Sequence, residues 1–178
     1  MDEFAVNYPK DSIVLTNVLN TLSGGRTVEA LGGASAVIEA GTVIVNDSGL
    51  RPLSSGVIKS SQASGDNTCD VAKGHGFQVG DSIKGGTITA IDSTTSETVD
   101  SITCSGTFGA TLSVDEEIVN DGGLAIGLVV TSQAKDAAGK VHVGIMNVGE
   151  ANENALPAPI DSNVKGALSL VSFTSDNA

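Results

Sequence analysis

Short apolar runs separated by turn residues dominate the chain from about residue 36 onwards. Residues 41–45 (GTVIV) are rich in β-branched side chains, and the turn sequence NDSG follows them. Between residues 69 and 112 turn signals recur at intervals of roughly eight to twelve residues, which is typical of a small β barrel or sandwich. Residues 124–130 (LAIGLVV) are apolar on both faces and predict a central strand. The pattern therefore predicts a mainly β fold.

The last third of the chain predicts a long β-hairpin over 124–148, then a short helix and a closing strand over 169–173. The helix is indicated by apolar residues at helical spacing, with Asp161 or Ser162 as its N-cap. Gly166 costs such a helix about 1 kcal/mol relative to alanine, so packing must hold it. The apolar residues that give this spacing are Val164, Ala167, Leu168 and Val171.

Two residues, Pro52 and Phe77, indicate their own places in the predicted β fold. Pro52 cannot donate a backbone hydrogen bond, so its segment is expected at a sheet edge or in a loop. Phe77 is one of only four phenylalanines and is expected to anchor a small core in the middle of the chain.

Residues 1–30 leave two interpretations open. Leu15, Val18, Leu19 and Leu22 are loosely helix-spaced, which is compatible with a short helix on the core. The alternative is an extended N-terminal arm lying along a partner, because apolar residues near a terminus need something to cover them.

The charge excludes some partners. The 178 residues contain 21 acidic and 9 basic side chains, a formal net charge of −12. Phosphate contacts need clustered Lys and Arg, so we expect no nucleic-acid partner, and an anionic membrane surface is disfavoured for the same reason. No stretch has the apolar length of a membrane span. If the partner is a protein, its docking face on this chain should be less acidic than the rest.

Candidate chemistry is sparse. His75 lies between two glycines, and its nearest carboxylate in sequence is Asp81, which gives a polar turn residue rather than a catalytic pair. The acidic run at 115–117 lacks the ligand order of a calcium loop. Cys69 and Cys104 are expected to be small, half-buried side chains, with a cross-strand disulfide as the alternative. We therefore expect a non-enzymatic protein without catalytic residues, metal or cofactor.

The tail resembles the C-terminal segment of head decoration and head-fibre proteins of tailed bacteriophages. The shared order is a strand, a Gly-Glu with a following Asn, an apolar-Pro loop, a short helix and a final apolar-x-Phe. The matching residues are 143–148, Gly149, Glu150, Asn152, Leu156, Pro157, 164–168 (VKGAL) and 171–173 (VSF). Upstream, residues 40–43 (AGTV) and 127–129 (GLV) match two further strands of that family, and residues 73–81 with 88–92 look like a small barrel inserted in some of its members.

We expect residues 1–30 to form the N-terminal arm, because of their apolar residues near a terminus. The resemblance implies a split decoration-protein-like β domain over 31–67 plus 123–178, and an inserted small β barrel over 68–122. It implies capsid decoration: binding of the major capsid protein on the outer surface of the virion, after synthesis in the host cytoplasm, by a homo-oligomer for which a trimer is favoured. The capsid-contact candidates are Ile13, Val14, Leu15, Leu22, Leu156 and Pro157.

Two alternatives stay open at this stage. One is a head-fibre or adhesion module whose inserted barrel binds a host-surface glycan, although such sites usually want exposed aromatic residues and the chain has few. The other is a scaffold or minor structural protein with no ligand beyond its own oligomer.

Overall fold

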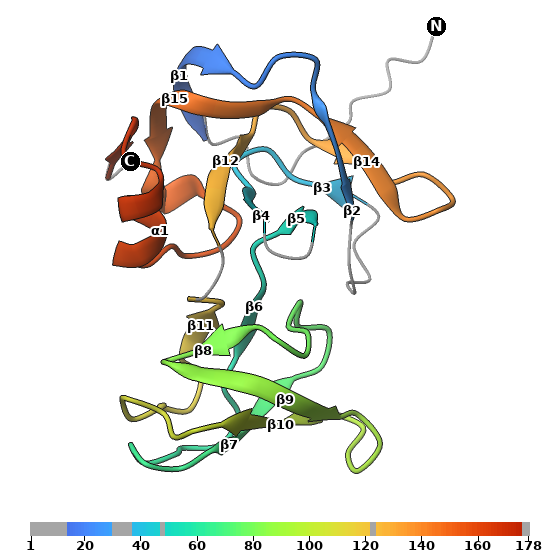
Figure 1. Cartoon of the computed structure of the whole chain (residues 1–178), viewed down its shortest axis with the longest axis vertical. Helices are drawn as coiled ribbons and strands as arrows, with labels where there is room; N and C mark the ends of the chain where they lie inside the picture. Colours follow the sequence, from blue (N-terminus) through green and yellow to red (C-terminus); the bar gives the residue numbers. More distant parts are fainter. Residues whose placement is uncertain (1–13, 30–36, 47–48, 122–123, 176–178) are drawn as a thin grey trace, which may run out of the picture.

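The chain folds into two β lobes, one above the other in Figure 1. The computed structural model describes residues 14–29, 37–46, 49–121 and 124–175. Strands make up 48% of the structure and helix 6%, which confirms a mainly β fold with one short α-helix. We call residues 55–121 the barrel lobe and the other described residues the host lobe.

The host lobe is built on a six-stranded sheet. Five strands have the order β1-β15-β12-β4-β5, and β16 pairs in parallel with β15. Their bounds are β1 Leu15–Thr21, β4 Val43–Asn46, β5 Leu50–Pro52, β12 Ala125–Val129, β15 Ile145–Asn152 and β16 Val171–Thr174. The predicted central strand is confirmed as β12, and Pro52 lies on the edge strand β5, as its missing N–H requires.

Two short pairs extend this sheet. They are β2 Arg26–Glu29 with β14 Lys140–Val143, and β3 Val37–Ile38 with β13 Gln133–Ala134. The chain thus runs through β1 and β2 antiparallel to β14 and β15, as a bent ribbon in blue and orange (Figure 1).

The predicted hairpin over 124–148 is only partly correct. β12 and β15 pair at Leu128 with Met146 and at Val129 with Ile145. Between them, β13 and β14 leave β12 and pair with β3 and β2 instead. This detour buries Val141 beside Val28 in a second apolar cluster of the host lobe, a contact that a closed hairpin would not make.

The expected arm at 1–30 is wrong for residues 14–29, and so is the helix. These residues form β1 and β2, whose partners belong to the host lobe. Register shifts interrupt the β1–β15 pairing at three places. Such irregularities break the alternation of side chains that marks a strand in a sequence, which explains the misleading helical spacing. Residues 1–13 lie outside the described residues.

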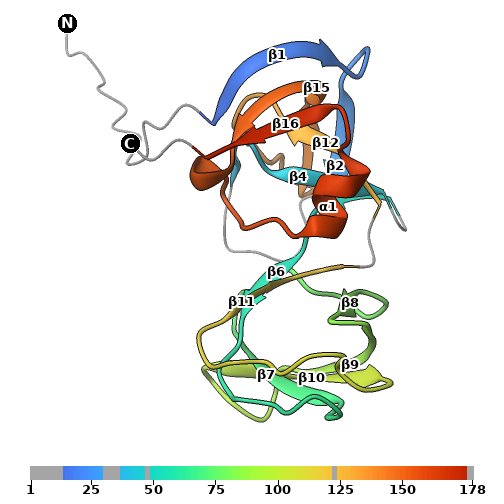
Figure 2. The ribbon, with the colours of Figure 1, turned by 90° about the vertical axis from the view of Figure 1, so that its left-hand side faces the viewer.

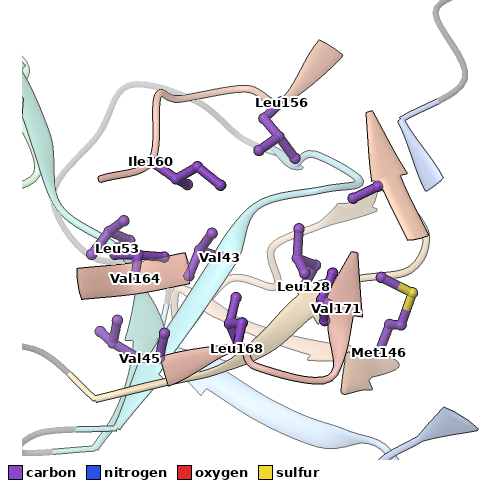
Figure 3. Close-up of a cluster of buried hydrophobic side chains, with 12 residues drawn as sticks. Val43, Val45, Leu53, Leu128, Met146, Leu156, Ile160, Val164, Leu168 and Val171 are labelled. Carbon is purple, nitrogen blue, oxygen red and sulfur yellow. The ribbon is translucent and has the colours of Figure 1, made fainter. Parts of the chain in front are cut away.

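The tail follows its prediction closely. A 3-10 turn, η1 Glu153–Ala155, leads to helix α1, Ser162–Ala167. The Asp161 carboxylate accepts a 2.8 Å hydrogen bond from the backbone N–H of Val164, which confirms one of the two predicted caps. Val164 and Leu168 of this region point into the main core of the host lobe, together with Val43, Leu128 and Met146 (Figure 3).

The barrel lobe forms a closed ring of strands (Figure 2). Its order is β7-β10-β9-β8, next to the pair β11-β6. A bridge between Ile58 and Val71 joins β6 to β7, and a 3.0 Å hydrogen bond from Asp121 N to Ser82 O joins the end of β11 to β8. The bounds are β6 Ser55–Val57, β7 Thr68–Ala72, β8 Ser82–Ile83, β9 Gly86–Asp92, β10 Val99–Ser105 and β11 Glu117–Val119.

The barrel lobe begins earlier than residue 68. The prediction that residues 55–67 belong to the split domain is wrong, because Ile58 is fully buried in the barrel core and β6 pairs with β11. The sequence hid this because the strand fades into a polar Ser/Gly-rich connection. Phe77 is 5% exposed within the same core, as predicted.

Candidate functional site

Three of the predicted capsid-contact residues meet inside the host lobe. Gly41 has a φ of +81°, and a Cβ built on it would lie 2.2 Å from Val14 Cγ1, 3.2 Å from Leu156 Cδ2 and 3.4 Å from Pro157 Cδ. Val14, Leu156 and Pro157 therefore pack over the bare backbone of Gly41. The structure assigns these side chains a packing role within the chain.

Burial separates the six candidates further. Leu156 is 9% exposed and belongs to the main core, so its side chain is not available to a partner. Leu15 and Leu22 are half-buried against the two host-lobe clusters. Pro157 is exposed, and Ile13 lies outside the described residues. The described residues of this predicted set therefore offer little exposed apolar surface to a partner.

The structure exposes a different apolar group on the same strand. Val18 and Leu19 of β1 are 39% and 68% exposed, and in the described part of the chain no strand pairs with the outer edge of β1. The sequence from residue 12 to residue 25 contains no charged side chain. We call Val18, Leu19 and this free edge the β1 surface. The sequence feature that indicates the β1 surface is the uncharged stretch from residue 12 to residue 25, in a strongly acidic chain.

A buried polar cluster lies where the two lobes meet. It consists of Arg51 on β5, Ser54, Asp81 just before β8, and Asn120 just after β11, each 3% exposed or less. The Arg51 guanidinium donates to both carboxylate oxygens of Asp81 and to the Ser54 hydroxyl. The Asn120 side-chain amide donates to Asp81 Oδ1 at 3.1 Å. In the sequence, Asp81 stands out only as the carboxylate nearest to His75.

His75 belongs to a second polar group in the barrel lobe. Its Nδ1 accepts from the backbone N–H of Phe77 at 3.1 Å, so the ring proton of the neutral form sits on Nε2. Nε2 lies 3.1 Å from Asp100 Oδ2, although the two are not aligned as a hydrogen bond, and Lys73 Nζ lies 2.9 Å from Asp100 Oδ1. Burial lowers the pKa of His75, and Asp100 opposes that effect. The imidazole of His75 is therefore neutral, and its Nδ1 fixes the turn before Phe77 by accepting the hydrogen bond from the Phe77 backbone N–H.

The two cysteines are free and buried in the barrel core. Burial raises the pKa of the Cys69 thiol to about 12, and burial also raises the pKa of Cys104. The cross-strand disulfide is therefore not formed, and both thiols are protonated and poorly nucleophilic.

Within residues 14–29, 37–46, 49–121 and 124–175, no group of three or more His, Cys, Asp or Glu side chains is placed to hold a metal ion. None of the described helices has the length and apolarity to cross a membrane. Comparisons of this chain with protein-family models, curated proteins and solved structures find no match.

Proposed function

We propose that this chain is an auxiliary structural protein of a tailed-bacteriophage head, which binds the outer surface of the assembled shell through its host lobe. The order of the tail motifs supports the family. The observation that carries the proposal is the β1 surface: β1 has no charged residue, Val18 and Leu19 are exposed, and no described strand pairs with its outer edge, in a chain of net charge −12. An unpaired strand edge is a template for pairing with another chain.

The charge distribution supports docking through the host lobe. Residues 55–121 carry 10 acidic and 3 basic side chains, and the remaining 111 residues carry 11 and 6. The barrel lobe thus has a net charge of −7 on fewer residues, against −5 for the rest. Many copies on one shell repel one another least when the more acidic lobe points away from the crowded surface.

If this chain binds the assembled shell but not its free subunits, the binding stabilises the shell by mass action. Full burial of one leucine side chain contributes roughly 1.5–3 kcal/mol. Leu19 is 68% exposed and can contribute a large part of that amount when a partner covers it. A modest contact of this size is sufficient when it is repeated over many copies.

The test is co-sedimentation with shells assembled from the major capsid protein of the same phage and lacking this chain. Leu19→Asn should weaken binding about tenfold, which corresponds to about 1.4 kcal/mol. Val114→Thr is the matched control, because Val114 is 53% exposed but lies on the barrel lobe. Equal binding by the two variants would refute the β1 surface as the docking face, and absence of binding by the unaltered chain would refute the function.

The homo-oligomer, with a trimer favoured, stays a prediction that sedimentation of the isolated chain tests, and the same measurement addresses the scaffold alternative. Nothing in the structure favours the glycan alternative. Phe77 and Phe108 are buried and Phe173 is half-buried, so among the described residues no phenylalanine offers an exposed ring for a sugar.

A further inference from the structure

The two lobes are joined by two neighbouring segments. The chain passes into the barrel lobe after Ser54, and near the other end of that lobe the backbone N–H of Asn120 donates to Ser54 O at 2.9 Å. Ser55 and Val119, the next residues into the barrel lobe, pair across β6 and β11. A joint of this kind, made of two adjacent strands, would by itself allow the lobes to bend, and relative motion is the default for domains with a small interface.

The buried polar cluster spans this joint. Arg51 comes from the host lobe, and Asp81 comes from the barrel lobe. Their side chains are 4% and 3% exposed, so water screens the pair little. Asp81 is satisfied on every side: Arg51 donates to both oxygens, Asn120 Nδ2 donates to Oδ1, and the backbone N–H of Gln78 donates to Oδ2 at 2.9 Å.

A second set of contacts holds β6, the first strand of the barrel lobe, on the core of that lobe. The backbone N–H of Gly76 donates to Ser55 O at 3.1 Å. A Cβ on Gly56 would lie 2.6 Å from Val71 Cγ1 and 2.9 Å from Phe77 Cε2. At Gly56, β6 therefore lies directly on the barrel core without room for a side chain, so the strand that follows the joint is fixed to the barrel lobe.

We infer that the pair of Arg51 and Asp81 is a clamp that makes the two lobes one rigid body. Bending at the joint would separate the two charges in a region from which water is excluded. It would also strip Asp81 of both hydrogen bonds from Arg51, and a buried charge that loses its charged partner is strongly disfavoured. The clamp is thus a positioning device: it sets the direction in which the barrel lobe projects from the host lobe. This inference does not depend on the proposed shell binding.

The test is backbone NMR relaxation on the full chain, read separately for the two lobes. The unaltered chain should show one rotational correlation time for both. In Asp81→Asn and in Arg51→Met, which remove one charge each, the barrel lobe should tumble faster than the host lobe, with its correlation time reduced by roughly a quarter or more. Lys59→Met is the control, because it removes an exposed ion pair with Asp115 inside the barrel lobe and should leave a single correlation time.

Asn120→Ala serves if a charge variant does not fold. It keeps both charges and removes the barrel-lobe donor that orients the Asp81 carboxylate toward Arg51, so the correlation times of the lobes should separate in the same direction but by less. A cluster that only adds local stability would lower the melting temperature and leave the lobes tumbling together. Two different correlation times in the unaltered chain, or a single one in the folded variants, would overturn the clamp.

Discussion

Leu156→Ala distinguishes a core residue from a contact residue at the position where sequence and structure disagree most. The substitution removes three carbon atoms from a side chain that is 9% exposed in the main host-lobe core. At about 0.8 kcal/mol for each buried carbon, the transfer loss is about 2.4 kcal/mol. The cavity left behind adds to this, so we expect a loss of about 3 kcal/mol in the free energy of unfolding, within the usual range for Leu→Ala in cores.

Thermal unfolding followed by circular dichroism measures the effect. A loss of 1 kcal/mol lowers Tm by roughly 2–4 °C in a protein of this size, so Leu156→Ala should lower Tm by about 6–12 °C. Leu170→Ala is the matched control, since the chemical change is identical and Leu170 is 66% exposed. We expect it to cost less than about 0.5 kcal/mol. Equal shifts in the two variants, or loss of shell binding by Leu156→Ala at unchanged Tm, would show that Leu156 faces a partner and that the burial argument is wrong.

Three further predictions concern the helix cap, the thiols and the histidine. Asp161→Ala should cost about 1 kcal/mol of stability in urea unfolding and Asp161→Asn much less, because only alanine lacks a capping oxygen; equal losses would contradict the cap. At pH 8, Cys69 and Cys104 should react with a thiol reagent only after denaturant is added, since burial raises both pKa values; prompt reaction of the native chain would contradict this. The pKa of His75 is lowered from 6.5, chiefly by burial and against the opposing effect of Asp100. The folded state thus binds this proton more weakly than the unfolded state, and stability should be highest above pH 6.5 and fall as the pH drops below it. His75→Gln should flatten that part of the stability profile, and an unchanged slope would exclude His75 as its source.

The parts of the fold that the sequence predicted correctly depend on local chemistry. The Asp161 cap needs only a donor three residues away, and the edge position of Pro52 follows from its missing N–H. Residues 124–130 are apolar on both faces because Ala125 and Leu128 pack into one host-lobe cluster, and Ile126 and Val129 pack into the other. In each case a few adjacent residues contain the whole physical reason.

The errors arose where partners are distant along the chain. The strand β1 depends on β15, far away in sequence, and its register shifts conceal the strand pattern. Leu156 lies in a loop by sequence, but its burial depends on Gly41 leaving space beneath it. Arg51 and Asp81 are 30 residues apart and look like two ordinary surface charges. No local pattern shows that folding will enclose both of them.

Because Ser55 and Val119 are adjacent, the barrel lobe can be replaced by another domain at the joint. The strand that enters the barrel lobe and the strand that ends it pair with each other at these two residues, next to the joint. A foreign domain whose two ends lie one strand spacing apart, about 4.8 Å, can be spliced there without stretching the host lobe. The graft has to present a carboxylate to Arg51, since a buried guanidinium that loses its charged partner would destabilise the host sheet itself. A domain displayed on this scaffold therefore needs one acidic side chain at a fixed place.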